Sequence, residues 1–110
     1  MKSYIQVTTT TETREQAQTI ARHLVEEKLA ACVQIVEPIT SIYRWKGKVE
    51  EAREWLCLIK TRDDLYDQVE KAIKKLHSYE TPEIIAVPIT KGSKEYLNWL
   101  DDELENKTKG

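Results

Sequence analysis

Residues 30–61 read AACVQIVEPITSIYRWKGKVEEAREWLCLIKT, and this stretch decides the fold. Two long segments rich in β-branched and apolar residues flank Lys46-Gly47, where glycine can take the positive φ that a tight turn needs. The pattern predicts one long β-hairpin. Pro38 interrupts the first arm, and because proline has no N–H to donate to a sheet, it marks a bend, a bulge or an edge position.

The turn also fixes how the two arms face each other. If Lys46-Gly47 is a two-residue loop, Trp45 faces Lys48. The same register predicts two further facing pairs, Cys32 with Thr61 and Cys57 with Val36. The two sulfurs then lie about four residues apart along the ladder, roughly 13 Å at about 3.3 Å per residue. A disulfide tolerates about 7 Å between Cα atoms, so both cysteines are predicted to be free thiols.

Shorter patterns on both sides of the hairpin predict the remaining elements. Thr13 and Gln16 form a capping-box pattern ahead of apolar residues at helical spacing. Thr61 and Asp64 are predicted to open the next helix, which ends in the lysine-rich turn before His77. Alternation or helical spacing predicts three further elements: a strand over Ser3–Thr9, a strand over Ile84–Ile89 and a helix from Ser93.

The predicted element order is β-α-β-β-α-β with an extra C-terminal helix. This is the order of a ferredoxin-like α+β sandwich, here with long hairpin strands. A chain of 110 residues is long enough for one core, so residues 1–110 are predicted to form a single domain. The polar residues at about 106–110 are predicted to fray.

The predicted strands carry apolar residues on both faces. Trp55, Cys57 and Ile59 alternate with Leu56 and Leu58, which are equally apolar. A strand that is apolar on both faces is usually buried on both faces. The two helices between the strands can cover only one face of a four-stranded sheet, and the chain has no spare segment for the other. We therefore predict that another copy of the chain covers it.

Composition narrows the classes of function. Charged residues make up 33% of the chain and the net charge is −2, so there is no basic stripe for nucleic acid. The sequence lacks the ~7–15 apolar residues of a signal peptide and the ~18 of a membrane helix. Two cysteines are too few for a secreted disulfide framework. These features predict a soluble, cytoplasmic protein with no membrane or nucleic-acid partner.

Two blocks of the chain resemble a known family. Residues 29–61, LAACVQIVEPITSIYRWKGKVEEAREWLCLIKT, resemble the signature of the CutA family of divalent-cation tolerance proteins, and residues 77–89, HSYETPEIIAVPI, followed by YLNWL at 96–100, resemble its second block. The resemblance extends from Ile5 to Trp99. It implies a ferredoxin-like subunit whose hairpin strands build a homotrimer, and a link to tolerance of divalent cations, copper above all. It also implies metal binding without an established catalytic reaction.

The chain departs from the family pattern at two places. His77 is followed by Ser78, where the family commonly has proline. The first strand, VTTTT, lacks the cysteine that some members carry near its end, and threonine is a much poorer ligand for a soft metal.

His77 and Cys32 are the candidate metal ligands. Imidazole suits copper and zinc, and a thiolate suits soft metals. The alternative for His77 is a structural one, a residue that closes a lysine-rich helix end. In either case His77 is expected to face solvent, so its removal is expected to leave oligomer mass and melting unchanged. The alternative for Cys32 is a small hydrophobe in the core. Because one imidazole binds weakly, we expect weak Cu(II) binding and no obligatory cofactor.

A second set of residues is predicted to lie at a cleft between subunits. Lys60 ends a strand that is predicted to be buried, and Glu83 begins one after the rigid Thr81-Pro82 step, so that an ammonium and a carboxylate are expected to pair. Such a pair is either structural or lines a polar cleft together with Tyr79 and Trp45. The large aromatic residues otherwise indicate packing.

Two other proteins with this type of fold offer alternative functions. Trimeric sensors resembling the PII signalling proteins bind an anion or metabolite between subunits, but they need a long loop where this chain has only Lys46 to Lys48. A hydrolase like acylphosphatase needs a glycine-rich phosphate cradle after the first strand, and TTTTETRE has no glycine. No catalytic triad is recognisable by spacing, so the chain is not expected to be an enzyme.

Overall fold

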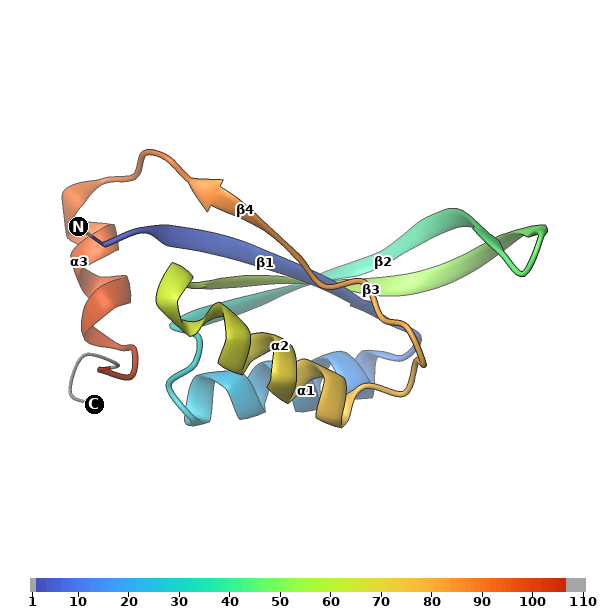
Figure 1. Ribbon diagram of the computed structural model, residues 1–110, viewed down its shortest axis with the longest axis horizontal. Helices are drawn as coiled ribbons and strands as arrows, with labels where there is room; N and C mark the ends of the chain where they lie inside the picture. The colour runs from blue at the N-terminus through green and yellow to red at the C-terminus, as the bar shows by residue number, and fades with distance from the viewer. Residues whose placement is uncertain (1, 107–110) are drawn as a thin grey trace.

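The computed structural model describes residues 2–106, and its elements follow the predicted order (Figure 1). The elements are β1 (Tyr4–Thr11), α1 (Arg14–Glu26), β2 (Cys32–Trp45), β3 (Lys48–Arg62), the short 3-10 turn η1 (Asp63–Leu65), α2 (Tyr66–Leu76), β4 (Ile85–Ile89) and α3 (Lys94–Asp102). The tail beyond residue 106, which the sequence predicts to fray, lies outside the described residues.

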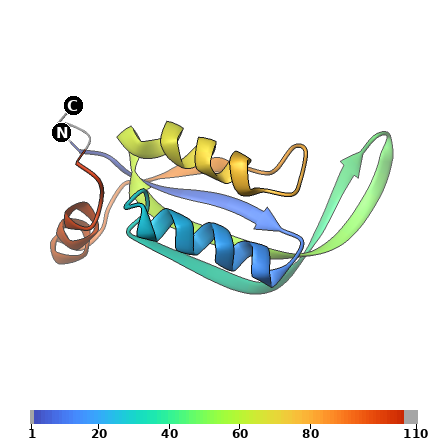
Figure 2. The same cartoon turned by 90° about the horizontal axis from the view of Figure 1, so that it is seen from below.

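The four strands form one antiparallel sheet in the order β2-β3-β1-β4, and α1 and α2 lie side by side on one of its faces (Figure 2). The ferredoxin-like α+β prediction is therefore confirmed. The face under the helices holds the main core, because every second residue of β1 and β3 points into it. The core residues of these two strands are Ile5, Val7, Cys57 and Ile59, packed against Ala17, Ile20, Leu24, Val69 and Ile73 of the helices.

The hairpin of β2 and β3 extends well past the ends of both helices, and it makes the molecule 45 Å long but only 26 × 23 Å across (Figure 1). Its turn is the predicted two-residue loop, with Trp45 opposite Lys48. Lys46 has φ 50° and Gly47 has φ 81°. Positive φ at both central residues is the geometry that matches the twist of the two strands.

A β-bulge lies where Pro38 was expected to disturb the strand. Val36 pairs with Leu56 and Ile39 with Glu54, so that two residues of β2 face one residue of β3. The predicted register is therefore right on the turn side of the bulge and wrong by one residue beyond it. Two pairs show the correction: Cys32 faces Lys60 rather than Thr61, and Cys57 faces Ile35 rather than Val36. Both cysteines are free, as predicted.

Two helix starts differ in detail from the prediction. Thr13 caps α1 and accepts the Gln16 N–H at 3.1 Å, but the Gln16 side chain donates to Leu76 O instead of closing the capping box. Thr61 does not open α2, because it pairs with Ile5 in the sheet and its hydroxyl donates to Leu29 O at 2.6 Å. The chain makes the 3-10 turn η1 before α2 begins.

Within residues 2–106, the second face of the sheet is covered at one end only. There α3 packs Leu100 and Leu104 against Leu65, with Tyr4 and Ala31 beside them. Arg62 is 6% exposed and stabilises this end of the sheet. Its guanidinium forms ion pairs with Asp64 and, at 3.0 Å, with Asp101, and it donates a hydrogen bond to the carbonyl of Glu105. Apolar side chains farther along the same face remain exposed: Ile85 by 54%, Val87 by 49% and Val36 by 37%.

Candidate functional site

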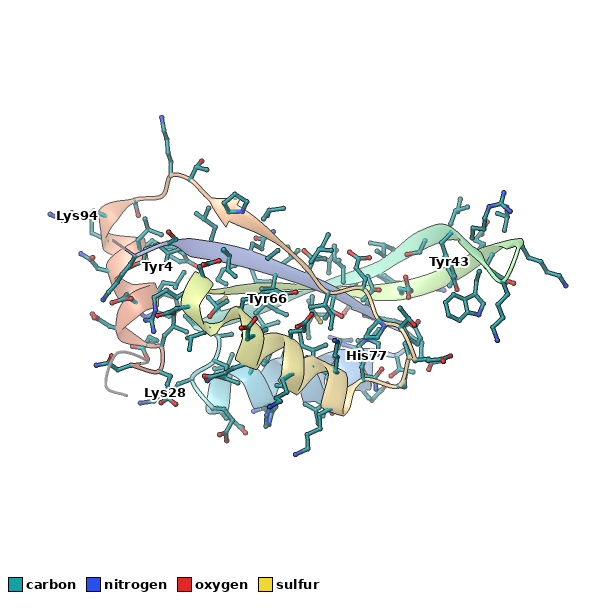
Figure 3. The ribbon with its side chains drawn as sticks, viewed as in Figure 1. Tyr4, Lys28, Tyr43, Tyr66, His77 and Lys94 are labelled. Carbon is teal, nitrogen blue, oxygen red and sulfur yellow. The ribbon has the colours of Figure 1, made fainter. Side chains whose placement is uncertain are left out.

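The candidate site lies where the chain crosses from α2 to β4, at residues 77–84. His77 is the C-terminal cap of α2, and its backbone N–H donates to Ile73 O. Its side chain reaches β1 beyond Thr8–Ile85, the last pair of β1 with β4 on that side. There Nε2 lies 2.7 Å from the carbonyl oxygen of Thr10. Figure 3 shows His77 at the end of α2.

The hydrogen bonds of His77 define its tautomer. A carbonyl oxygen can only accept, so Nε2 carries the proton that is donated to Thr10 O. The Tyr79 backbone N–H donates to Nδ1 at 3.1 Å, so Nδ1 carries the lone pair. The ring is half-buried and tilted against the Tyr79 ring, with centroids 4.8 Å apart. The prediction that His77 is a solvent-facing residue is therefore wrong, because Nε2 is held by the distant Thr10 carbonyl and Nδ1 by the nearby Tyr79 amide.

Tyr79 is held at its other end by a buried carboxylate. Its hydroxyl donates to Glu54 Oε2 at 2.8 Å, and Glu54 is only 6% exposed. Burial, followed by the hydrogen bond to Glu54, raises the pKa of the Tyr79 phenol above its ordinary value, so the hydroxyl stays a proton donor near neutral pH. Ser78, the residue between His77 and Tyr79, places its hydroxyl oxygen 3.1 Å from Glu12 Oε1 and 2.9 Å from Gln16 Oε1. The turn is thus tied to β1, β3 and the region where α1 begins.

Cys32 is not close to His77. It begins β2 opposite Lys60, at the level of Gln6 on β1, whereas His77 bonds to Thr10. Four residues of a strand span about 13 Å. Cys32 is half-buried and lies on the second face of the sheet. The alternative predicted for Cys32, a small hydrophobic residue in the core, describes Cys57 instead, which is fully buried. Burial raises the pKa of the Cys57 thiol to about 11.

The four residues predicted for a cleft are not brought together within one chain. The Lys60 ammonium donates to the side-chain oxygen of Gln34, its diagonal neighbour on the second face. Glu83 is exposed, and among residues 2–106 no ion pair joins it to Lys60. Trp45 lies at the hairpin turn, about 40 Å along β3 from the level of Lys60. Tyr79 bonds to Glu54 instead, a partner that sequence reasoning missed.

Sequence reasoning also missed the charged cluster at the α3 end. Asp101 accepts from the Lys2 ammonium at 2.7 Å and from the Arg62 guanidinium. The hydrogen bond from Lys2, followed by that from Arg62, lowers the pKa of the Asp101 carboxyl below its ordinary value. An open groove of about 610 Å³ lies beside this cluster, and Asp63 and Asp102 also line it. The partners are far apart in sequence, so no local pattern indicates them.

The described residues do not form a closed metal site. Within the part of the chain that the structure describes, no three His, Cys, Asp or Glu side chains gather closely enough to hold a metal ion. His77 does have the support that metal-binding histidines usually have, because its second ring nitrogen donates to a backbone carbonyl. One supported imidazole favours binding of modest strength, since tight sites need three or four ligands.

Fold and site together define a class of protein: a ferredoxin-like α+β chain whose sheet has an extended hairpin and exposed apolar residues on the face away from α1 and α2. The family model described as CutA1 divalent ion tolerance protein matches residues 5–103. A divalent-cation tolerance protein CutA from Thermus thermophilus is 52% identical over 91 residues, which are 83% of this chain and 88% of that protein. The chain belongs to the CutA1 divalent ion tolerance protein family.

Solved structures of the family agree with this fold. CutA1 from Oryza sativa has a TM-score of 0.93 and 41% identity, with 96% of both chains covered. CutA from Archaeoglobus fulgidus, described as a periplasmic divalent cation tolerance protein, has a TM-score of 0.87 and 44% identity, with 96% of this chain and 100% of that chain covered. Among residues 2–106, no helix combines the length and the apolar character that a bilayer crossing needs.

Proposed function

We propose that the chain works as a homotrimer in divalent-cation tolerance and binds Cu(II) weakly through His77. The exposed apolar strip on the second sheet face carries the oligomer part of the proposal. Its most exposed members are Val36 at the β2 edge of the sheet and Ile85 and Val87 at the β4 edge, with Leu56 and Leu58 of β3 between them. The other face of the sheet is filled by the helices. Such strips mark interaction sites in soluble proteins, and a second copy supplies an equally apolar face.

The trimer is tested by mass. Light scattering at low micromolar concentration is expected to give about three times the chain mass of 12.8 kDa. Unfolding is expected to shift to higher temperature as protein concentration rises, because assembly is linked to folding by mass action. A clean monomer with a concentration-independent midpoint would contradict this part of the proposal.

The metal part is tested by calorimetric titration. Cu(II) is expected to bind with a Kd of about 1 µM or weaker, because a single imidazole supplies the affinity. His77→Ala is expected to abolish most of the binding, and Cys32→Ala to change it only slightly. His23→Ala removes the other histidine of the sequence and serves as the matched control. Nanomolar binding that survives His77→Ala would show that the site lies elsewhere.

Two finer points belong to the same proposal. The chain is proposed to have no enzymatic role, in keeping with a family named for tolerance and not for a reaction. It is also proposed to be cytoplasmic, because the two cysteines are free thiols and a reducing compartment keeps thiols free.

A second candidate function is favoured by the position of Lys60. Lys60 is a half-buried residue whose exposed ammonium lies on the second sheet face beside Gln34, where it would face a neighbouring subunit. An anion or metabolite bound between subunits would pair with that ammonium, as in a PII-like sensor. Calorimetric titration of the protein and of Lys60→Met with common nucleotides tests this candidate, and heat that is identical in both proteins would exclude Lys60 as the binding group.

A further inference from the structure

One carboxylate on the open face of the sheet is buried without a cation beside it. Glu54 is 6% exposed and alternates along β3 with residues of the helix face such as Trp55 and Cys57, so it lies on the opposite face. Its Oε2 accepts the Tyr79 hydroxyl at 2.8 Å. Among residues 2–106, no lysine, arginine or histidine forms an ion pair with it. Because a buried charge is costly unless it is paired, Glu54 lacks the partner that its burial normally requires.

One ammonium on the same face lacks a carboxylate. Lys60 follows Glu54 by six residues on β3, so it shares the face and lies about 20 Å away at about 3.3 Å per residue. The Lys60 ammonium donates to the neutral side chain of Gln34, and within residues 2–106 no aspartate or glutamate forms an ion pair with it. An ion pair needs its charged atoms within about 4 Å, so the two charges of one chain cannot meet.

The other charged side chains at this face of the described strands are already solvated or paired. Arg62 forms ion pairs with Asp64 and Asp101 of its own chain. Lys48 and Glu50 are exposed to water at the turn end of the hairpin. The strand positions of β1, β2 and β4 on this face carry no charged residue. The buried glutamate and the half-buried lysine are therefore the two charges that are left for each other.

Apolar residues separate these two charges along β3. Leu56 and Leu58 lie between them, and the exposed Val36, Ile85 and Val87 lie on both sides of the two leucines. A second copy that packs head to tail on this face would bury the apolar centre and bring its ammonium to the carboxylate. Head-to-tail contacts repeat around a closed ring, so that a trimer would contain three such pairs.

We infer that Lys60 of one subunit pairs with Glu54 of the next subunit, so that each carboxylate that anchors Tyr79 is completed by a neighbouring copy of the chain. This inference rests on the proposed function, because it assumes the homotrimer. It adds which charges join the subunits and in which sense the subunits pack. It also assigns the Lys60 ammonium a protein partner in place of a free anion.

A double-mutant cycle on the full chain tests the pair. Lys60→Met keeps the side-chain length but leaves Glu54 buried without a cation, so the protein concentration at which half of the trimer dissociates is expected to rise at least about tenfold. Glu54→Gln removes the charge and keeps an acceptor for the Tyr79 hydroxyl. In the wild-type background it is expected to weaken the trimer, because it leaves the ammonium unpaired. In the Lys60→Met background it is expected to tighten the trimer at least about threefold, because the unpaired carboxylate is gone.

This change of sign is specific to a contact between chains. Sites about 20 Å apart in one chain have additive effects, so without a contact between subunits Glu54→Gln would act equally in both backgrounds. Light scattering over a dilution series measures dissociation, at one urea concentration that partly dissociates the wild type. Glu50→Gln, at the exposed glutamate on the same face, is the matched control and is expected to act equally in both backgrounds. Lys60→Gln replaces Lys60→Met in the cycle if circular dichroism shows that the methionine variant does not fold.

Inorganic phosphate tests the alternative occupant of the position beside Lys60. Replacing chloride by phosphate at equal ionic strength is expected to leave dissociation of the wild type within about twofold, because the ammonium already has a carboxylate partner. If phosphate tightened the wild-type trimer but not that of Lys60→Met, a free anion would be the partner of Lys60, and the inference would be overturned.

The outcomes separate this inference from the proposed function. A trimer in which Glu54→Gln has the same effect with and without Lys60 would overturn the inference and leave the trimer in place. A rescue of Lys60→Met by Glu50→Gln as large as that by Glu54→Gln would also overturn it. A wild type that is a monomer throughout the dilution series without urea would overturn the homotrimer of the proposed function, and the inference with it.

Discussion

Parts of β3 and β4 are apolar on both faces of the sheet, but the two faces have different surroundings in the structure. On the helix face, Val7, Cys57 and Ile59 are fully buried by α1 and α2. On the opposite face, Ile85 and Val87 are about half exposed, and within residues 2–106 only α3 packs on that side, at one end. Alternation along a strand assigns residues to faces, but it does not say what covers each face.

The comparison separates the apolar residues that a single chain buries from those that it leaves exposed. Folding of one chain explains the helix face completely. The exposed isoleucine and valine of the open face are what the proposed association would bury. Substitutions on the two faces are therefore expected to affect different measurements.

Ile59→Ala tests the helix face and has the largest expected effect. Ile59 is 0% exposed, and its truncation leaves a cavity between β3 and the helices. The expected loss is about 2–5 kcal/mol of unfolding free energy per chain. Urea unfolding at fixed protein concentration measures it. A loss below about 1 kcal/mol would mean that the helix face repacks easily and is not the rigid core inferred here.

Val87→Glu tests the open face. A carboxylate there stays hydrated in one chain, so each chain is expected to remain folded, but it would be buried without a partner in the trimer, at a cost of about 2 kcal/mol or more per interface. Light scattering is expected to show loss of the trimer while circular dichroism keeps its helical signal. Val25→Glu, at an exposed valine on α1, is the control and is expected to keep the wild-type mass. Equal masses for both variants would remove the distinction between the faces.

Within residues 2–106, α3 covers one end of the open sheet face, and Asp101→Asn tests the charged contacts that hold it there. Loss of the charge-assisted bonds to Lys2 and Arg62 is expected to lower stability by about 1–2 kcal/mol at pH 7. The pKa of the Asp101 carboxyl is lower in the folded chain than in the unfolded one, so its contribution is full at neutral pH and is lost as pH falls through the folded-state value.

The difference between wild type and Asp101→Asn is therefore expected to shrink toward zero in strong acid. Urea unfolding at pH 7 and at pH 2–3 measures the difference. Asp102→Asn, at the exposed neighbour, is expected to behave like the wild type at both pH values. A difference that stays constant with pH would show that the Asp101 charge does not hold α3.

Alkylation of the two cysteine thiols compares the two faces of the sheet without any substitution in the wild-type protein, and its expected effect is the smallest. Cys57 lies on the helix face with its pKa raised to about 11, so iodoacetamide at pH 8 is expected to leave it unmodified in the folded protein. Cys32 lies half-buried on the open face and is expected to react first. Its reaction is expected to be faster in Val87→Glu than in the wild type, because association shields it. Mass spectrometry counts the added groups, and faster modification of Cys57 would reverse the assignment.

Local patterns in the sequence predicted the elements well, because they depend on spacing that one segment contains. The hairpin turn at Lys46-Gly47 and the Ser93 cap of α3 are examples. The register beyond Pro38 was not predictable to the residue, because a bend, a bulge and an edge position share the same sequence signal. One extra residue then shifts every later pair.

The sequence predicted which residue types belong to the candidate site, but not the contacts that they make. His77 was identified from its chemistry, but its role depends on Thr10 and Tyr79, and the first of these is 67 residues away. The bond from Tyr79 to Glu54 and the Arg62–Asp101 pair are likewise long-range contacts. Contacts of this kind follow from the packing of the finished fold, and no spacing rule in one sequence anticipates them.

The bulge in β2 has a consequence for how the length of this hairpin can change in evolution. Two residues there face a single residue of β3, so a gene that lost the codon for Pro38 would encode an arm that pairs continuously. Every side chain on both sides of that point would keep its face of the sheet. Loss of one codon elsewhere in the arm would turn all residues on one side of the deletion to the wrong face. Alignments of related hairpins should therefore place their single-residue gaps at this position.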